Sequence, residues 1–110
     1  MEGFVKGDVI VAPVIFTDLS GCKRRPALVV ASGGGDDLII CKVTSRSVRD
    51  RYAVQIDQGD FESGSLKRPS NVRPNQFMTI DRKAVLYTVG RLTRSTVNKV
   101  IDRCVEVLRQ

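Results

Sequence analysis

One stretch of the sequence decides the fold: residues 26–43, PALVVASGGGDDLIICKV. Two apolar runs, at residues 27–31 and 38–43, flank a turn made of serine, glycine and aspartate. Both runs are rich in β-branched residues and too short for helices, and a glycine-rich turn between two such runs is typical of a β-hairpin. The stretch therefore predicts two antiparallel strands whose open ends, at Arg25 and Thr44, lie together opposite the turn.

Further strands are predicted on both sides of this hairpin. Apolar or alternating runs at residues 9–12, 52–56 and 87–92 predict strands, and we expect the first of them to end at Pro13. Residues 71–80 have weaker strand character, and Pro74 indicates an edge strand or a bulge there, because proline cannot donate to a ladder. The acidic residues 57–66 predict a surface excursion, and residues 81–84 one helical turn.

The C-terminal segment predicts an amphipathic helix. Its apolar residues recur at helical spacing: Val97, Val100, Ile101, Cys104, Val105 and Leu108. Thr93 or Ser95 can cap the start of this helix. Short strands with glycine-rich turns, followed by one helix, predict a mainly β fold: a small, strongly bent β-barrel of about six strands with a C-terminal helix, in a single domain over residues 1–110.

Composition limits the chemistry. The chain has 110 residues, no histidine, three cysteines and a formal charge of +6. Without histidine, Ser-His and Cys-His nucleophiles and most metal sites are excluded. The cysteines form no CxxC pair, and we expect Cys41 and Cys104 in the core. The positive charge favours a polyanionic partner only weakly, because surface charge also serves solubility.

The location of the protein is predicted from what the sequence lacks. The longest apolar stretch is far too short to cross a bilayer, and no secretory signal pattern opens the chain. We therefore expect a cytoplasmic protein.

Two polar groups at the open end of the hairpin are candidates for a phosphate site. Pro26 holds Arg25 extended at the start of its strand, and a fixed guanidinium suits bidentate phosphate binding. A charged strand edge that discourages aggregation is an equal alternative. Thr44 emerges at the same end, so a guanidinium and a hydroxyl could together stabilise a developing oxyanion. From the residues alone, capping of a loop by Thr44 and Ser45 is the better-supported interpretation.

Two further segments carry polar groups that suit nucleic acid. The loop at residues 46–51 holds three arginines, and Tyr52, Tyr87 or Phe16 could offer a ring for base stacking. With only six aromatic residues in the chain, we expect most of them in the core. Residues 71–81 hold Arg73, Asn75, Gln76 and Asp81, which could read base edges or form an ordinary solvated edge.

Taken together, these pieces resemble the MazF/PemK (Kid) family, the toxins of bacterial type II toxin–antitoxin pairs. The resemblance extends over residues 6–108. It rests on the order and spacing of five short matches: KGDVIV at 6–11, RRPALVV at 24–30, KVTS at 42–45, QFMTID at 76–81 and VGRLT at 89–93.

The resemblance implies an SH3-like β-barrel, usually a homodimer, and metal-independent cleavage of single-stranded RNA, mostly mRNA, at short sequences. Attack by the ribose 2′-hydroxyl would leave 2′,3′-cyclic phosphate and 5′-hydroxyl ends, with no cofactor. A cognate antitoxin would cover the same surface. By motif, Arg25 and Thr44 would be catalytic. The two loops and the glutamine motif would supply RNA contacts: Asp18, Ser20, Lys23, Arg24, Ser45, Arg46, Arg49, Arg51, Arg73, Asn75 and Gln76.

The chain departs from the family pattern at several positions. Asn75 stands where several members have an acidic residue, Met78 stands where a basic residue is frequent, and the loop at residues 17–24 is shorter than in many members. A non-catalytic RNA- or partner-binding barrel is therefore the alternative function. A topoisomerase poison of the same fold is disfavoured, because it depends on aromatic residues at the helix terminus and this chain ends VLRQ.

Overall fold

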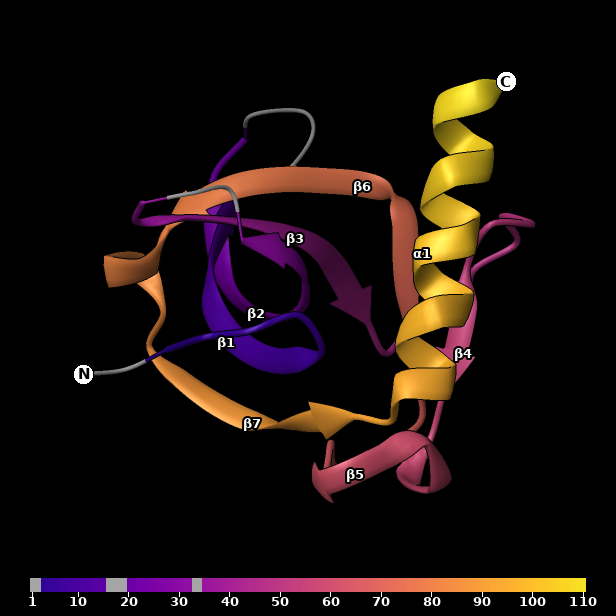
Figure 1. Cartoon of the computed structure of the whole chain (residues 1–110), viewed down its shortest axis with the longest axis horizontal. Helices are drawn as coiled ribbons and strands as arrows, with labels where there is room; N and C mark the ends of the chain where they lie inside the picture. The colour runs from indigo at the N-terminus through magenta and orange to yellow at the C-terminus, as the bar shows by residue number, and fades with distance from the viewer. Residues whose placement is uncertain (1–2, 16–19, 33–34) are drawn as a thin grey trace.

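The computed structural model describes residues 3–15, 20–32 and 35–110. In this part of the chain, seven antiparallel strands form one sheet that curls into a half-barrel, with a single α-helix beside it (Figure 1). The elements are β1 (Asp8–Ile15), β2 (Cys22–Ser32), β3 (Asp37–Thr44), β4 (Val54–Ile56), β5 (Phe61–Gly64), β6 (Ser70–Asp81), β7 (Tyr87–Leu92) and α1 (Arg94–Arg109). The strand order is β4-β6-β3-β2-β1-β7-β5.

The mainly β class with a C-terminal helix is confirmed, and the strand count is seven rather than about six. The additional strand lies in the segment that the sequence predicts as a surface excursion. This segment holds a short 3₁₀ turn, Gln58–Asp60, followed by β5, which pairs with β7 at the end of the sheet. Acidic composition does not exclude a strand there, because β5 is a largely exposed edge strand and buries little side-chain surface.

The hairpin of β2 and β3 is confirmed and lies at the centre of the sheet. Ala27 is opposite Lys42, and the two strands are antiparallel. Successive residues of β1, β2 and β3 enter two different core clusters, one on each face of the sheet. One cluster, with Val9, Leu28 and Cys41, includes residues of α1; the other holds Ile10, Ala27 and Ile40. Burial of both faces explains why these strands are apolar without alternation.

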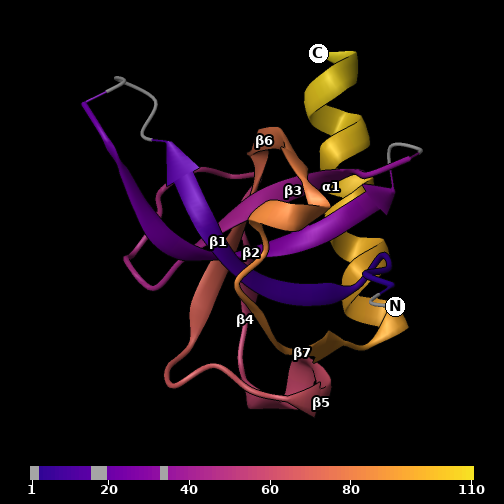
Figure 2. The same ribbon diagram turned by 90° about the vertical axis from the view of Figure 1, so that its left-hand side faces the viewer.

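Beyond the main sheet, β1 and β2 continue together as a two-stranded ribbon (Figure 2). The prediction that the first strand ends at Pro13 is wrong, because β1 continues to Ile15. The last pair between β1 and β7 is Val11 with Tyr87, so β2 is the one neighbour described beside Pro13, and proline is tolerated at such an edge. The prediction that Arg25 begins its strand is also wrong, since it is the fourth residue of β2.

A large bulge interrupts the pairing of β6 with β3. Cys41 is opposite Phe77 but Val43 is opposite Val72, so residues 73–76 of β6 face the single residue Lys42 of β3. Pro74 is buried within this bulge. The prediction that Pro74 marks an edge or a bulge is confirmed, because Pro74 lies in this bulge, two residues beyond the last pair between β6 and β4.

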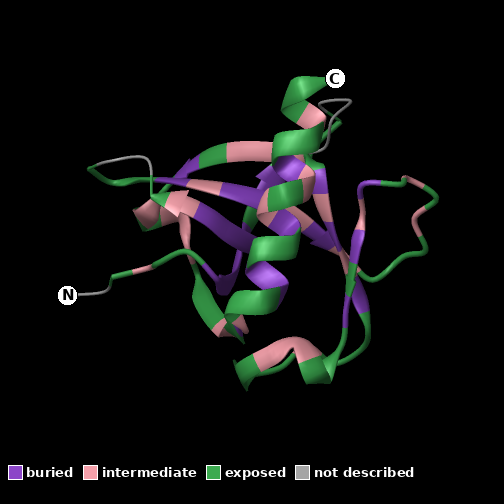
Figure 3. Ribbon diagram, turned by 45° about the vertical axis from the view of Figure 1, so that its right-hand side comes forward, coloured by how far each residue is buried: buried purple, intermediate pink, exposed green. Residues whose placement is uncertain are grey.

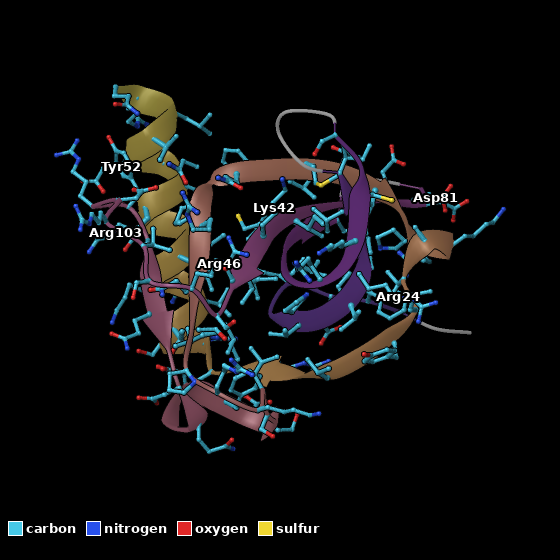
Figure 4. All side chains as sticks on the ribbon, turned by 180° about the vertical axis from the view of Figure 1, so that it is seen from behind. Arg24, Lys42, Arg46, Tyr52, Asp81 and Arg103 are labelled. Carbon is cyan, nitrogen blue, oxygen red and sulfur yellow. The ribbon has the colours of Figure 1, made fainter. Side chains whose placement is uncertain are left out.

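A turn closed by Asp50 delays the start of β4. Its carboxylate accepts a hydrogen bond from the Tyr52 amide at 2.7 Å, and its carbonyl oxygen accepts one from the Ala53 amide at 3.3 Å. The strand predicted from residue 52 therefore begins only at Val54. The Tyr52 ring is buried, and its hydroxyl donates to the Gln110 amide oxygen at 3.0 Å beside α1 (Figure 4). Tyr52 thus packs the loop against the helix and offers no ring for stacking.

The C-terminal helix follows its predicted pattern. Thr93 is the N-cap, and its hydroxyl accepts a hydrogen bond from the Thr96 amide at 3.3 Å. Val97, Val100 and Cys104 are buried against the sheet, while the end of the helix is exposed (Figure 3). The predicted helical turn after residue 80 is the 3₁₀ turn Arg82–Ala84.

In the described residues, no helix combines the length and apolar character required to cross a membrane.

Candidate functional site

Two adjoining hollows meet at the end of β3. The first hollow, of about 540 Å³, lies between the end of β3, residues 65–68 and Tyr87. The second hollow, of about 640 Å³, lies between the same strand end, Lys23 and the bulge of β6. Arg25, Thr44 and Arg46 line both hollows. We call the position that these three residues share the junction.

Strand pairing brings Arg25 and Thr44 to the junction. The β2–β3 ladder ends at the pair Ala27–Lys42; Arg25 precedes Ala27 by two residues and Thr44 follows Lys42 by two, so both leave the same open end of the hairpin. β3 ends at Thr44, and the side chains gathered at this strand end line both hollows. The proximity expected from the hairpin is therefore observed.

The Thr44 hydroxyl is oriented by the loop that follows it. Its oxygen accepts a hydrogen bond from the Arg46 amide at 3.2 Å, which is the loop capping favoured by the residues alone. A hydroxyl has one donor and two acceptor positions, and this bond uses an acceptor position. Among the described residues the O–H of Thr44 has no acceptor and can donate to a ligand, so capping and ligand binding are compatible.

The two hollows are lined by cations and by no carboxylate of the described residues. The seven cations are Lys23, Arg25, Lys42, Arg46, Lys67, Arg68 and Arg73. Within the described chain, the one ion pair among them joins Arg73 to Asp50, at 3.4 Å. Cations concentrated in concave surfaces attract and hold polyanions. The net positive charge alone favours a polyanionic partner only weakly. The structure shows that seven of the cations lie together around these two hollows.

Asp50 organises the polar side of the second hollow, and sequence analysis missed it. Arg73 and Asn75 both donate hydrogen bonds to its carboxylate. Burial alone would raise the pKa of Asp50, but hydrogen bonds from the Tyr52 amide and from Asn75 and Arg73 outweigh burial and hold this pKa below its ordinary value. The carboxylate therefore fixes Arg73 beside the hollow. The one available signal in the sequence was that Asp50 is the single acidic residue in the loop at residues 46–51, among three arginines.

The structure brings most of the sequence-predicted site residues together. Besides Arg25 and Thr44, the hollows are lined by Ser20, Lys23, Ser45, Arg46, Arg73 and Gln76. Four others line neither hollow: Arg24, Arg49, Arg51 and Asn75. Asp18 lies outside the described residues.

Local geometry accounts for three of the four residues outside the hollows. Arg24 neighbours Arg25 on a strand whose side chains alternate, and Figure 4 shows Arg24 well apart from Arg46. Arg51 lies over the Tyr52 ring, 4.7 Å from its centroid, on the side of α1. Asn75 is turned toward Asp50 by the bulge.

Sequence analysis missed three cations of the hollows: Lys42, Lys67 and Arg68. Lys42 lies opposite the bulge of β6, and its ammonium donates to the Ile15 carbonyl oxygen at 2.9 Å. For the other two a signal existed, because the sequence KRP at 67–69 repeats the basic-basic-proline pattern of RRP at 24–26. Only the fold shows that residues of both copies, Arg25 and Pro26 with Lys67 and Arg68, line the first hollow.

The sequence matches a family model over residues 5–108, and its description is PemK-like, MazF-like toxin of type II toxin-antitoxin system. No curated protein matches the sequence.

Several solved structures are similar. Mycobacterium tuberculosis toxin MazF-mt6 is 18% identical with a TM-score of 0.73, covering 93% of this chain and 96% of that one. An endoribonuclease in complex with its cognate antitoxin, from Mycobacterial species, is 16% identical with a TM-score of 0.77, covering 97% and 96%. MazF from Deinococcus radiodurans is 19% identical with a TM-score of 0.76, covering 100% of both chains. At these identities the structural likeness shows the fold alone.

Proposed function

From the premise that this chain belongs to the family of PemK-like, MazF-like toxins of type II toxin–antitoxin systems, we propose that it is an endoribonuclease that cleaves single-stranded RNA. The observation that carries the proposal is the junction, where Arg25 and Thr44 meet between two hollows lined by seven cations. A phosphodiester held at the junction would have a positively charged surface on both sides along the strand. This arrangement suits a substrate that is a chain of phosphates.

The proposed reaction is attack of a ribose 2′-hydroxyl on the adjacent phosphorus. The bond from phosphorus to the 5′-oxygen breaks; the 2′-hydroxyl loses one proton and the leaving 5′-oxygen gains one, which leaves a 2′,3′-cyclic phosphate and a free 5′-hydroxyl with no net change in protons. A guanidinium remains protonated in proteins, so Arg25 acts as a positioning and charge-stabilising group and not as a base. The Thr44 hydroxyl donates to a non-bridging phosphate oxygen, where negative charge develops in the transition state.

The RNA contacts of the proposal are the residues that line the hollows. Lys23, Arg46 and Arg73 supply charge around the second hollow, while Ser20, Ser45 and Gln76 supply neutral hydrogen-bonding groups in the two hollows. Residues outside the hollows, Arg24 above all, are left out of the proposed contacts.

The proposal includes two protein partners, a cognate antitoxin and a second copy of this chain. One of the similar structures is an endoribonuclease in complex with its cognate antitoxin. For this chain, the cations of the hollows would be complementary to an acidic antitoxin segment that competes with RNA. The homodimer rests on the family resemblance, and light scattering coupled to size-exclusion chromatography tests it.

The test is cleavage of a long single-stranded RNA by the purified protein in excess EDTA. We expect fragments whose 5′ ends polynucleotide kinase labels without prior phosphatase treatment, because they carry hydroxyl groups. Arg25→Ala should lower the cleavage rate by roughly a hundredfold to a thousandfold, the usual effect of removing one donor to a developing oxyanion. Thr44→Val keeps the size of the side chain and removes the hydroxyl, so it should also slow cleavage.

Arg24→Ala is the matched control, because it removes an arginine from the same strand outside the hollows. It should retain most of the cleavage rate. Equal losses in Arg24→Ala and Arg25→Ala would contradict the assignment of the junction as the reaction site. RNA binding without cleavage would favour the non-catalytic alternative, which one observation supports: none of the described residues that line the hollows has a carboxylate or an imidazole.

A further inference from the structure

Tyr87 has a position that the fold does not explain. Its side chain is 56% exposed, although it is one of the largest in the chain, and it belongs to neither core cluster. Among the described residues, its hydroxyl has no hydrogen-bond partner. The ring nevertheless lines the first hollow, beside the junction. A large exposed ring in a concave surface indicates a binding contact.

The floor of the first hollow is a row of apolar residues that ends at this ring. Val11 is opposite Tyr87 on one side and opposite Pro26 on the other, and the register of the hairpin continues the row to Val43. Directly opposite residues of antiparallel strands point to the same face. All four residues line the first hollow. Four neighbouring strands therefore build one apolar floor with an aromatic ring at its end.

The walls of the same hollow carry positive charge. Lys67 and Arg68 lie on one side, and Arg25 and Arg46 lie at the junction. A ligand that is only an anion would leave the apolar floor unused, and a purely apolar ligand would leave the cations unused. A nucleotide of single-stranded RNA matches both, because its base has an apolar face and its phosphate is an anion.

The other described aromatic rings are already committed to packing. Tyr52 is buried against α1, and Phe61 and Phe77 pack on the first core cluster. Phe4 packs on the second cluster, with Arg82 over its ring. Within the described chain, Tyr87 is therefore the aromatic ring that the hollows offer to a base.

We propose that Tyr87 is the stacking platform for an unpaired nucleobase next to the phosphate held by Arg25 and Thr44, in the first hollow. The inference rests on the proposed function and deepens it, because it names the group that holds the neighbouring base. Stacking tolerates every base, so Tyr87 contributes affinity and alignment, and the first hollow binds unpaired rather than duplex RNA.

The absence of tryptophan from the chain gives a direct test. Tyr87→Trp introduces a single indole at the proposed platform, and Leu86→Trp introduces one at the adjacent exposed residue, which lines neither hollow. Each variant is titrated with a 2′-O-methyl oligonucleotide, which cannot be cleaved because it lacks the attacking hydroxyl. We expect strong quenching of the indole in Tyr87→Trp and little in Leu86→Trp. An oligonucleotide of the same length with abasic sites should leave both unquenched.

A second pair of variants measures the affinity. Tyr87→Phe keeps the ring and should bind the oligonucleotide nearly as tightly as the wild type. Tyr87→Leu keeps an apolar side chain without a ring, and its dissociation constant should rise by about 5- to 150-fold, the usual effect of losing one base–aromatic stack. Because Tyr87 is exposed and outside the core, both variants should remain folded, which circular dichroism verifies.

The outcomes separate this inference from the proposed function. Cleavage of RNA by the wild type, together with an unquenched Tyr87→Trp that still binds, would overturn the stacking platform alone. Equal affinities of Tyr87→Leu and Tyr87→Phe would do the same. If the wild type neither binds nor cleaves RNA, both proposals fail. If the 2′-O-methyl oligonucleotide quenches Tyr87→Trp but the wild type does not cleave RNA, the stacking platform is supported and the nuclease activity is overturned.

Discussion

Raising the salt concentration from about 50 to about 200 mM should weaken the binding of single-stranded RNA to this protein by roughly 20- to 300-fold. The magnitude follows from the hollows. Seven cations line them, and one of these, Arg73, is already paired with Asp50, which leaves six for phosphates. Each phosphate contact on a single strand adds about −0.7 to the slope of log K against log salt.

The two ends of this range correspond to different lengths of RNA in the hollows. If all six cations contact phosphates, the slope is about −4, and a fourfold rise in salt weakens binding roughly 300-fold. If three of them do, the slope is about −2 and the factor is roughly 20. Fluorescence anisotropy with a labelled 2′-O-methyl oligonucleotide measures the slope without interference from cleavage.

Charge-neutralising variants assign the slope to particular side chains. Lys67→Gln removes a cation from the first hollow and should reduce the slope by about 0.7. Lys99→Gln removes an exposed cation from α1, outside both hollows, and should leave the slope unchanged. A wild-type slope shallower than −1, or equal changes in the two variants, would show that the hollows do not hold the phosphates.

Three further predictions concern the fold and the support of the site. Gly90→Ala should lower the free energy of unfolding by about 1–3 kcal/mol in urea titrations, because the new Cβ collides with the backbone of β5, whereas Gly21→Ala meets open space and should change little. Asp50→Asn should be less stable than the wild type at pH 7; since the pKa of Asp50 is lowered on folding, this difference should fade as the pH drops below about 4, and a constant difference down to pH 2 would contradict it. A thiol reagent should modify one cysteine of the native protein, the exposed Cys22, and all three in denaturant, so rapid modification of more than one in the native state would disprove the burial of the other two.

Much of the fold was predictable because local patterns and burial agree. The runs of β2 and β3 are apolar on both faces since both faces are buried, and α1 has a single apolar stripe since only one side meets the sheet. These apolar patterns depend on which faces of an element are buried and not on which neighbour buries them, so they can be recognised in the sequence alone. The boundaries were less predictable, because Pro13 ends a strand only where it would break a ladder, and no β7 partner is described beyond Val11.

The candidate site was predictable only in part. The hairpin implies that Arg25 and Thr44 emerge together, since register is a local property of two strands joined by a short turn. The charges around them are a different case. Lys67 and Arg68 are distant in sequence from the hairpin, and no pattern relates them to it. The bulge of β6 likewise depends on how β3 pairs, which decides that Arg73 reaches a hollow while Asn75 turns to Asp50.

By itself, the sequence determined the mainly β class, the central hairpin and the chemistry that is absent, because composition and short-range periodicity carry that information. Tertiary structure alone decided which of the basic and aromatic side chains share a surface. Residues from β1, β2, β3 and β7 form the floor beneath Tyr87, and their order along the chain says nothing about that row. Strand pairing across the curled sheet creates the row, because it joins segments that are remote in sequence at a spacing of one strand.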